Sequence, residues 1–104
     1  MGVTLVPIPC ACGRTCAYTV RGGPQHQSAE ARDPFSWVAT AVDRESDGRR
    51  WAYVIAAHGR MSRREYWDTA RQLVAMGYEW VAYEHNGEIS TISRLDVERR
   101  QRNG

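Results

Sequence analysis

Two glycine-containing dipeptides constrain the fold of this chain more than any other feature of its sequence. Asp47-Gly48 and Asn86-Gly87 are both typical of two-residue type I′ turns, in which both residues take positive φ angles. Each dipeptide lies between stretches rich in β-branched and aromatic residues, which favour strands. If these dipeptides form the loops, apolar residues and opposite charges pair across each hairpin. The sequence therefore predicts two β-hairpins.

A helix is expected between the two hairpins. Ser62 and Glu65 have the spacing of a capping box, in which each side chain accepts a hydrogen bond from the other residue's backbone amide. From Tyr66 to Val74, apolar residues recur at the three- and four-residue spacing of one helix face. Gly77 then suits the left-handed position at the C-terminal end of the helix.

These elements follow in ββαββ order over residues 35–94, which we expect to form a single core domain of the α+β class. The expected architecture is an antiparallel β-sheet of four to five strands, with one long helix packed on a face. Residues 1–34 are expected to form an irregular, cysteine-containing N-terminal arm with a short strand at 17–20. Residues 95–104 are expected to form a basic C-terminal tail that begins as a short helix.

The N-terminal arm contains a candidate zinc site. Its cysteines, Cys10, Cys12 and Cys16, are the only ones in the chain. The fourth ligand could be His26, His58 or His85, of which His26 is the nearest in sequence. Three thiolates and one imidazole are a common ligand set for tetrahedral zinc, so the pattern indicates one structural zinc ion that tethers the arm. The alternative is that three reduced thiols pack near the core. The odd number of cysteines excludes a fully paired disulfide framework.

All fourteen basic residues are arginine, and the formal net charge is +2. GC-rich coding explains this bias most simply, although arginine is also well suited to binding phosphate. Three arginines lie at the start of the expected helix, where backbone amides favour an anion, and three lie in the C-terminal tail. These candidate anion- or nucleic-acid-binding residues are Arg60, Arg63, Arg64, Arg99, Arg100 and Arg102.

His58 precedes the expected helix and is the one candidate catalytic residue. As a general base, with a nearby arginine stabilising a pentavalent phosphate, it would make the protein a small metal-independent ribonuclease. The alternative is a solvated loop in which His58 simply ends a strand. Because no other catalytic pattern is present in the sequence, we do not expect an enzyme.

Four tryptophans and five tyrosines exceed what a core of this size requires. In the expected strand 51–57, apolar residues occupy both faces, and one helix covers only one of them. The other face is expected to contact the arm, a second copy in a homodimer, or another partner. The candidate partner-binding residues are Trp37, Trp51, Tyr53, Trp80 and Tyr83.

These observations together indicate a small non-enzymatic binding module that engages a host or partner protein. The arginine-rich composition fits an accessory or phage-encoded regulator from a high-GC bacterium. Nucleic-acid binding through the arginine clusters is the first alternative, and the ribonuclease is the second. Because no segment has the length of a membrane span or the flanks of a secretory signal, we expect a cytoplasmic protein without a membrane partner.

Overall fold

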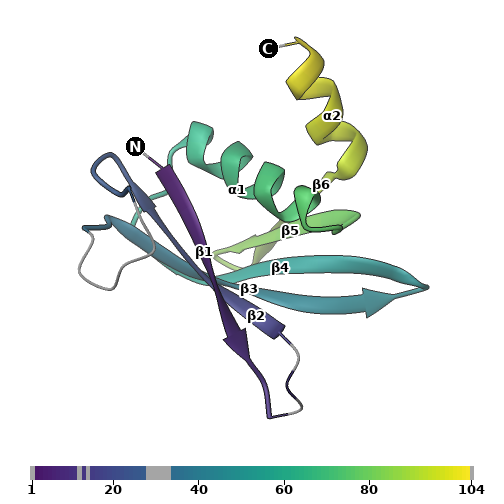
Figure 1. Ribbon diagram of the computed structural model, residues 1–104. Helices are drawn as coiled ribbons and strands as arrows, with labels where there is room; N and C mark the ends of the chain where they lie inside the picture. Colours follow the sequence, from purple (N-terminus) through teal and green to yellow (C-terminus); the bar gives the residue numbers. More distant parts are fainter. Residues whose placement is uncertain (1, 12, 14, 28–33, 104) are drawn as a thin grey trace.

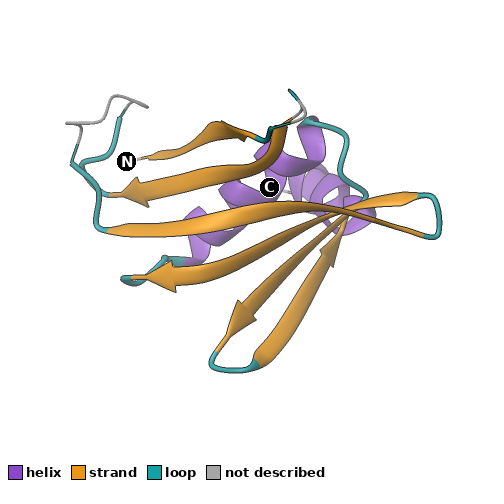
Figure 2. Cartoon of the chain, turned by 90° about the horizontal axis from the view of Figure 1, so that it is seen from below, coloured by secondary structure: helices purple, strands orange, loops and turns teal. Residues whose placement is uncertain are grey.

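The computed structural model describes residues 2–11, 13, 15–27 and 34–103. It contains a single sheet of six strands in chain order and two helices. Both helices lie on the same face of the sheet, as Figures 1 and 2 show from two directions. The elements are β1 (Gly2–Pro9), β2 (Thr15–Gly23), β3 (Trp37–Ser46), β4 (Arg49–His58), α1 (Arg63–Ala75), β5 (Trp80–His85), β6 (Glu88–Ser93) and α2 (Arg94–Asn103).

The sheet is mixed because α1 crosses over between two neighbouring strands. All neighbouring strands are antiparallel except β4 and β5, which are parallel and pair Trp51 with Trp80 and Val54 with Tyr83. A helix between two strands returns the chain to the end where the first strand began, and this connection produces parallel pairing. No helix in the described part of the chain is long and apolar enough to cross a membrane.

The expected fold class is wrong in two respects. We expected four to five antiparallel strands with one helix, whereas the structure has a six-stranded mixed sheet with two helices. The expected irregular N-terminal arm forms the paired strands β1 and β2, and the tail helix is a full element, α2. Pro7 and Pro9 weaken the strand signal in the arm, but proline is tolerated in β1 because it is an edge strand.

The local predictions over residues 37–93 are confirmed. Asp47 and Asn86 have positive φ angles in their turns, and Glu45 pairs with Arg50 as the predicted register requires. The helix α1 begins with the predicted capping box of Ser62 and Glu65. These features depend on interactions between residues close in sequence, which sequence patterns capture well.

The core lies between the sheet and the two helices. Alternate residues of the inner strands face the helices, and apart from Trp37 the buried ones of β3 and β4 are alanine and valine. The hydroxyl of Tyr83 donates a hydrogen bond of 2.7 Å to the backbone carbonyl of Tyr66, fixing β5 to α1. The core residues on the sheet include Val3, Tyr18, Val20, Ala39, Ala41, Ala52, Val54, Val81, Tyr83 and Ile92, and those on the helices Ala70, Leu73, Val74 and Val97.

Trp37 is the largest fully buried side chain and depends on a glycine opposite it. Gly22 of β2 pairs with Trp37 of β3, and the indole ring lies across the space where a Cβ of Gly22 would stand. Such a Cβ would be 2.6 Å from Cε2 of the ring and closer still to Cζ2, a contact that real structures do not tolerate. Glycine is therefore required at position 22 by the contact with Trp37. It is not required by backbone conformation, since its φ lies outside the left-handed region.

We expect Gly22→Ala to lower the free energy of unfolding by about 1–3 kcal/mol, because the added methyl group overpacks the site. Chemical denaturation measures this change. In a Trp37→Phe background, where a single smaller ring replaces the indole, the same substitution should cost less. An equal cost in both backgrounds would contradict the assigned contact between Gly22 and the Trp37 ring.

Candidate binding surface

One face of the sheet is not covered by the helices, and we call it the open face. Along β4, Trp51, Tyr53 and Ile55 alternate with the buried residues Ala52 and Val54, so their side chains point away from the helices. In Figure 2 both helices lie behind the sheet, which leaves this face toward the viewer. The residues that register and alternation place on the open face include Thr4, Val6, Thr19, Arg21, Val38, Thr40, Val42, Trp51, Tyr53, Ile55, Trp80, Ala82 and Thr91.

Three aromatic rings are in contact on the open face. The ring centroids of Trp51 and Trp80 are 5.2 Å apart with an angle of 13° between their planes. Those of Trp51 and Tyr53 are 6.1 Å apart with an angle of 25°. All three side chains are partly exposed. We call Trp51, Tyr53 and Trp80 the aromatic platform.

Arginine side chains flank one end of the aromatic platform. The guanidinium of Arg44 lies 5.8 Å from the ring centroid of Tyr53, and Arg44 pairs with Trp51 across the hairpin. Arg49 is exposed and belongs to the same face by alternation along β4. The acidic residue on this face in β5, Glu84, lies at the other end of the parallel strands. The sequence analysis missed Arg44, although the Asp-Gly turn already placed it opposite Trp51.

The predicted partner-binding residues divide between the two faces of the sheet. Trp51, Tyr53 and Trp80 are together on the open face. Trp37 and Tyr83 instead face the helices, where they are 2% and 7% exposed. Burial and the neighbouring Tyr66 raise the pKa of Tyr83, as expected for a phenol enclosed in the core.

The arginines at the start of α1 are exposed, but its terminal amides are already occupied. Oε1 of Glu65 accepts a hydrogen bond of 2.8 Å from the Ser62 amide, and Ser62 Oγ accepts one of 3.1 Å from the Glu65 amide. An anion here would therefore meet a carboxylate. This arrangement disfavours the predicted anion site at Arg60, Arg63 and Arg64.

The arginines of α2 lie on the helix side of the sheet, away from the aromatic platform. Arg99, Arg100 and Arg102 are exposed. The guanidinium of Arg100 lies 4.5 Å from the ring centroid of Trp67 on α1, so it also joins the two helices. These predicted nucleic-acid-binding arginines of α2 thus lie on the surface formed by the helices, and they add no charge to the open face.

The carboxyl of Glu65 is buried against Trp37. Burial raises the pKa of this carboxyl, but the backbone amide and hydroxyl of Ser62 and the polar Trp37 indole beside it together outweigh burial and lower the pKa. Trp37 Nε1 and Glu65 Oε2 are both buried, and neither forms a hydrogen bond with a described residue. Glu65 therefore links the start of α1 to the core.

His58 ends β4 and is exposed. Its backbone pairs with Val38 beyond an irregularity in the ladder between β3 and β4, where Ala56 has a positive φ of 53°. Among the described residues, no arginine forms a hydrogen bond or ion pair with His58. The ribonuclease hypothesis gains no support from this geometry.

Cys10 and Cys16 form a disulfide at the turn between β1 and β2, whereas the sequence analysis expected reduced thiols. Their Cα atoms are 5.9 Å apart. Cys12 lies outside the described residues. Among the residues that the structure does describe, no group of three or more metal-ligating side chains occurs. The predicted zinc ion stays a prediction, and its binding would require reduction of this disulfide.

The remaining proposed zinc ligand, His26, lies at the opposite end of the β1–β2 hairpin. Its Nε2 is 2.6 Å from Thr4 Oγ1, and its Nδ1 donates a hydrogen bond of 3.0 Å to the Pro34 carbonyl. Thr4 and Cys10 are separated by about 20 Å of extended chain. The structure therefore does not bring His26 to the cysteines, and both of its ring nitrogens are already in use.

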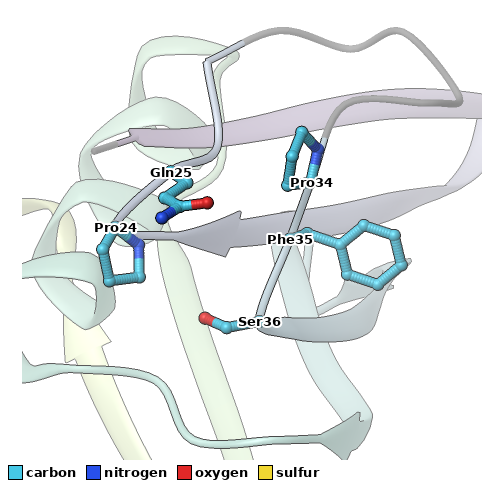
Figure 3. A pocket seen from close by; sticks show the side chains of 5 residues that line it. All are labelled: Pro24, Gln25, Pro34, Phe35 and Ser36. Atoms are coloured by element: carbon cyan, nitrogen blue, oxygen red, sulfur yellow. The ribbon is translucent and has the colours of Figure 1, made fainter.

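A partly open pocket of about 270 Å³ lies beside His26, between the ends of the 24–36 connection. Figure 3 shows Pro24 and Gln25 on one side of it and Pro34, Phe35 and Ser36 on the other. None of the residues that line it carries a charged side chain. We therefore assign it no role.

Comparisons of this chain with protein-family models, curated proteins and solved structures found no significant match. Its function is therefore inferred from its own surface chemistry.

We expect Glu65→Gln to lower the free energy of unfolding by about 1 kcal/mol at pH 7, because hydrogen bonds to a charged acceptor are lost. The pKa of Glu65 is lower in the folded state than 4.5, so its contribution is present above pH 4.5 and disappears as pH falls through the folded pKa. Denaturation at neutral and acid pH measures this difference, with the exposed Glu98→Gln as control. An equal loss at both pH values would contradict it.

Native mass spectrometry of protein purified without chelator or reductant tests the state of the cysteines. The disulfide between Cys10 and Cys16 predicts a mass two hydrogens below that of the fully reduced chain, and Cys16→Ser should abolish this deficit. A bound zinc ion that is lost in Cys12→Ser would instead support the ligand set expected from the sequence.

Proposed function

We propose that this protein is a small non-enzymatic binding module that engages its partner through the open face of the sheet. The observation that carries the proposal is the aromatic platform. Its three rings contact one another while remaining partly exposed on a face without a covering helix. Aromatic side chains bury large areas at small conformational cost, and they dominate many binding surfaces.

The chemistry of the open face favours binding over catalysis. Its central part consists of aromatic, aliphatic and hydroxyl side chains, and arginine supplies the charge at one end. These groups provide contact area and hydrogen-bond donors. His58, which pairs with the open-face residue Val38, lies at the end of β4 far from Trp51 and Tyr53. A role as an accessory regulator, with a host protein or a second copy as partner, is compatible with such a surface.

Site-specific photo-cross-linking in the producing cell tests the proposal. We expect p-benzoylphenylalanine at Thr91, an exposed residue of the open face, to give a specific adduct. The matched control carries the same group at Gln101, an exposed residue of α2 on the helix side of the sheet. An adduct from Thr91 that is absent from Gln101 and weakened by Tyr53→Ala supports the proposal.

The nature of the adduct identifies the class of partner. A protease-sensitive adduct indicates another protein, twice the chain mass indicates a second copy, and sensitivity to nuclease indicates a nucleic acid. Equal adducts from both positions, or none from Thr91, would overturn the proposed use of the open face.

A further inference from the structure

We propose that the partner of the open face is a single-stranded nucleic acid. Its bases would stack on Trp51, Tyr53 and Trp80, and its phosphates would contact Arg44 and Arg49. This inference rests on the proposed use of the open face for binding and names the class of partner.

The first argument is the arrangement of the rings. Trp51 and Tyr53 lie on one strand, and Trp80 lies on the next. The ring planes of Tyr53 and Trp80 are inclined by 25° and 13° to the ring plane of Trp51. Such an array gives successive bases a common stacking direction, and every base has a π-face that an aromatic ring accepts. A sheet with helices on one face and stacking aromatics on the other is a recurrent solution for binding unpaired bases.

The second argument is that the arginines beside the aromatic platform have no acidic partner among the described residues. Arg50, Arg71 and Arg94 form ion pairs with acidic residues of this chain. Arg44 and Arg49, in contrast, form no ion pair with any residue that the structure describes. Uncompensated guanidinium groups beside an aromatic surface favour an anionic ligand with planar groups, which describes the phosphates and bases of nucleic acids.

The third argument is the distribution of charge along the face. Both arginines lie near the start of β4, beside Trp51 and Trp80. Glu84 lies toward the other end of β5, about 13 Å of extended strand beyond Trp80. Glu79 precedes β5, and its carboxylate is 3.3 Å from the guanidinium of Arg94. Asp43 and Glu45 alternate with Arg44 along β3 and so belong to the other face, and Asp47 lies in the turn. On the open face, the charged strand residues at this end, Arg44 and Arg49, are both positive.

Single strands fit this surface better than duplexes do. In a duplex the bases are stacked on one another, so a flat sheet reaches only their edges and the backbone. In a single strand the base planes are accessible to the rings. A purely apolar protein partner would leave Arg44 and Arg49 without a counter-charge.

Binding is tested with the full chain and fluorescein-labelled oligonucleotides, using fluorescence anisotropy. The probes are oligo-dT and oligo-rU of about ten nucleotides, a length within the usual footprint of such surfaces, and a duplex of equal length. We expect binding of a single-stranded probe, quenching of tryptophan fluorescence and weaker binding to the duplex. Preference for one of the two single strands distinguishes DNA from RNA as the ligand.

Variants of the open face provide the decisive comparison. Tyr53→Ala should raise the Kd at least about fivefold, whereas Tyr53→Phe keeps the ring and should bind like the unmodified chain. Arg44→Gln should weaken binding and reduce the slope of log Kd against log salt by about one. Arg99→Gln on α2 removes the same charge elsewhere and should have little effect. Circular dichroism confirms that each variant is folded.

Several outcomes would overturn the inference. Absence of single-strand binding at low salt would do so, and so would a preference for the duplex. Binding that is lost in Arg99→Gln but not in Arg44→Gln would place the nucleic acid on the helices. If no oligonucleotide binds while the Thr91 cross-link yields a protein adduct, the proposed function stands and only this inference fails. If neither experiment gives a signal, both fail.

Discussion

The position of α1 determines both the core and the exposed surface of this protein. Because the helix connects β4 to β5, the two strands are parallel, and this pairing places Trp51 beside Trp80. The same helix covers one face of the sheet, and its first turn is held by Glu65 and by the hydrogen bond from Tyr83 to the Tyr66 carbonyl. The aromatic platform therefore depends on a helix that lies on the opposite side of the sheet.

The sequence predicted the local elements of this fold better than their arrangement. Turn dipeptides and a capping box act over a few residues, so the two hairpins and α1 were predicted correctly. The parallel pairing of β4 and β5 depends on contacts across more than twenty residues, and no local pattern encodes it. β1 was missed because its prolines resemble a loop, although an edge strand tolerates them, and β2 was expected only as a short strand at 17–20.

The candidate site was predictable in part. Alternation along β4 places Trp51 and Tyr53 on one face, and that inference required only the period of a strand. Whether Trp37 and Tyr83 are exposed depends on which face the helices cover, which composition does not reveal. The position of His26 was also not predictable from sequence. It is close to the cysteines along the chain, but its hydrogen bonds hold it at the far end of the hairpin.

The disulfide lies at the β1–β2 turn, at one edge of the sheet. It joins residues six positions apart, so the loop it closes is short, and its removal changes the entropy of the unfolded chain less than that of a long-range bridge would. Two strands, β2 and β3, lie between β1 and the aromatic platform. Reduction would loosen one edge of the sheet and leave the platform in place. The same binding surface can therefore be presented in reducing and in oxidising compartments.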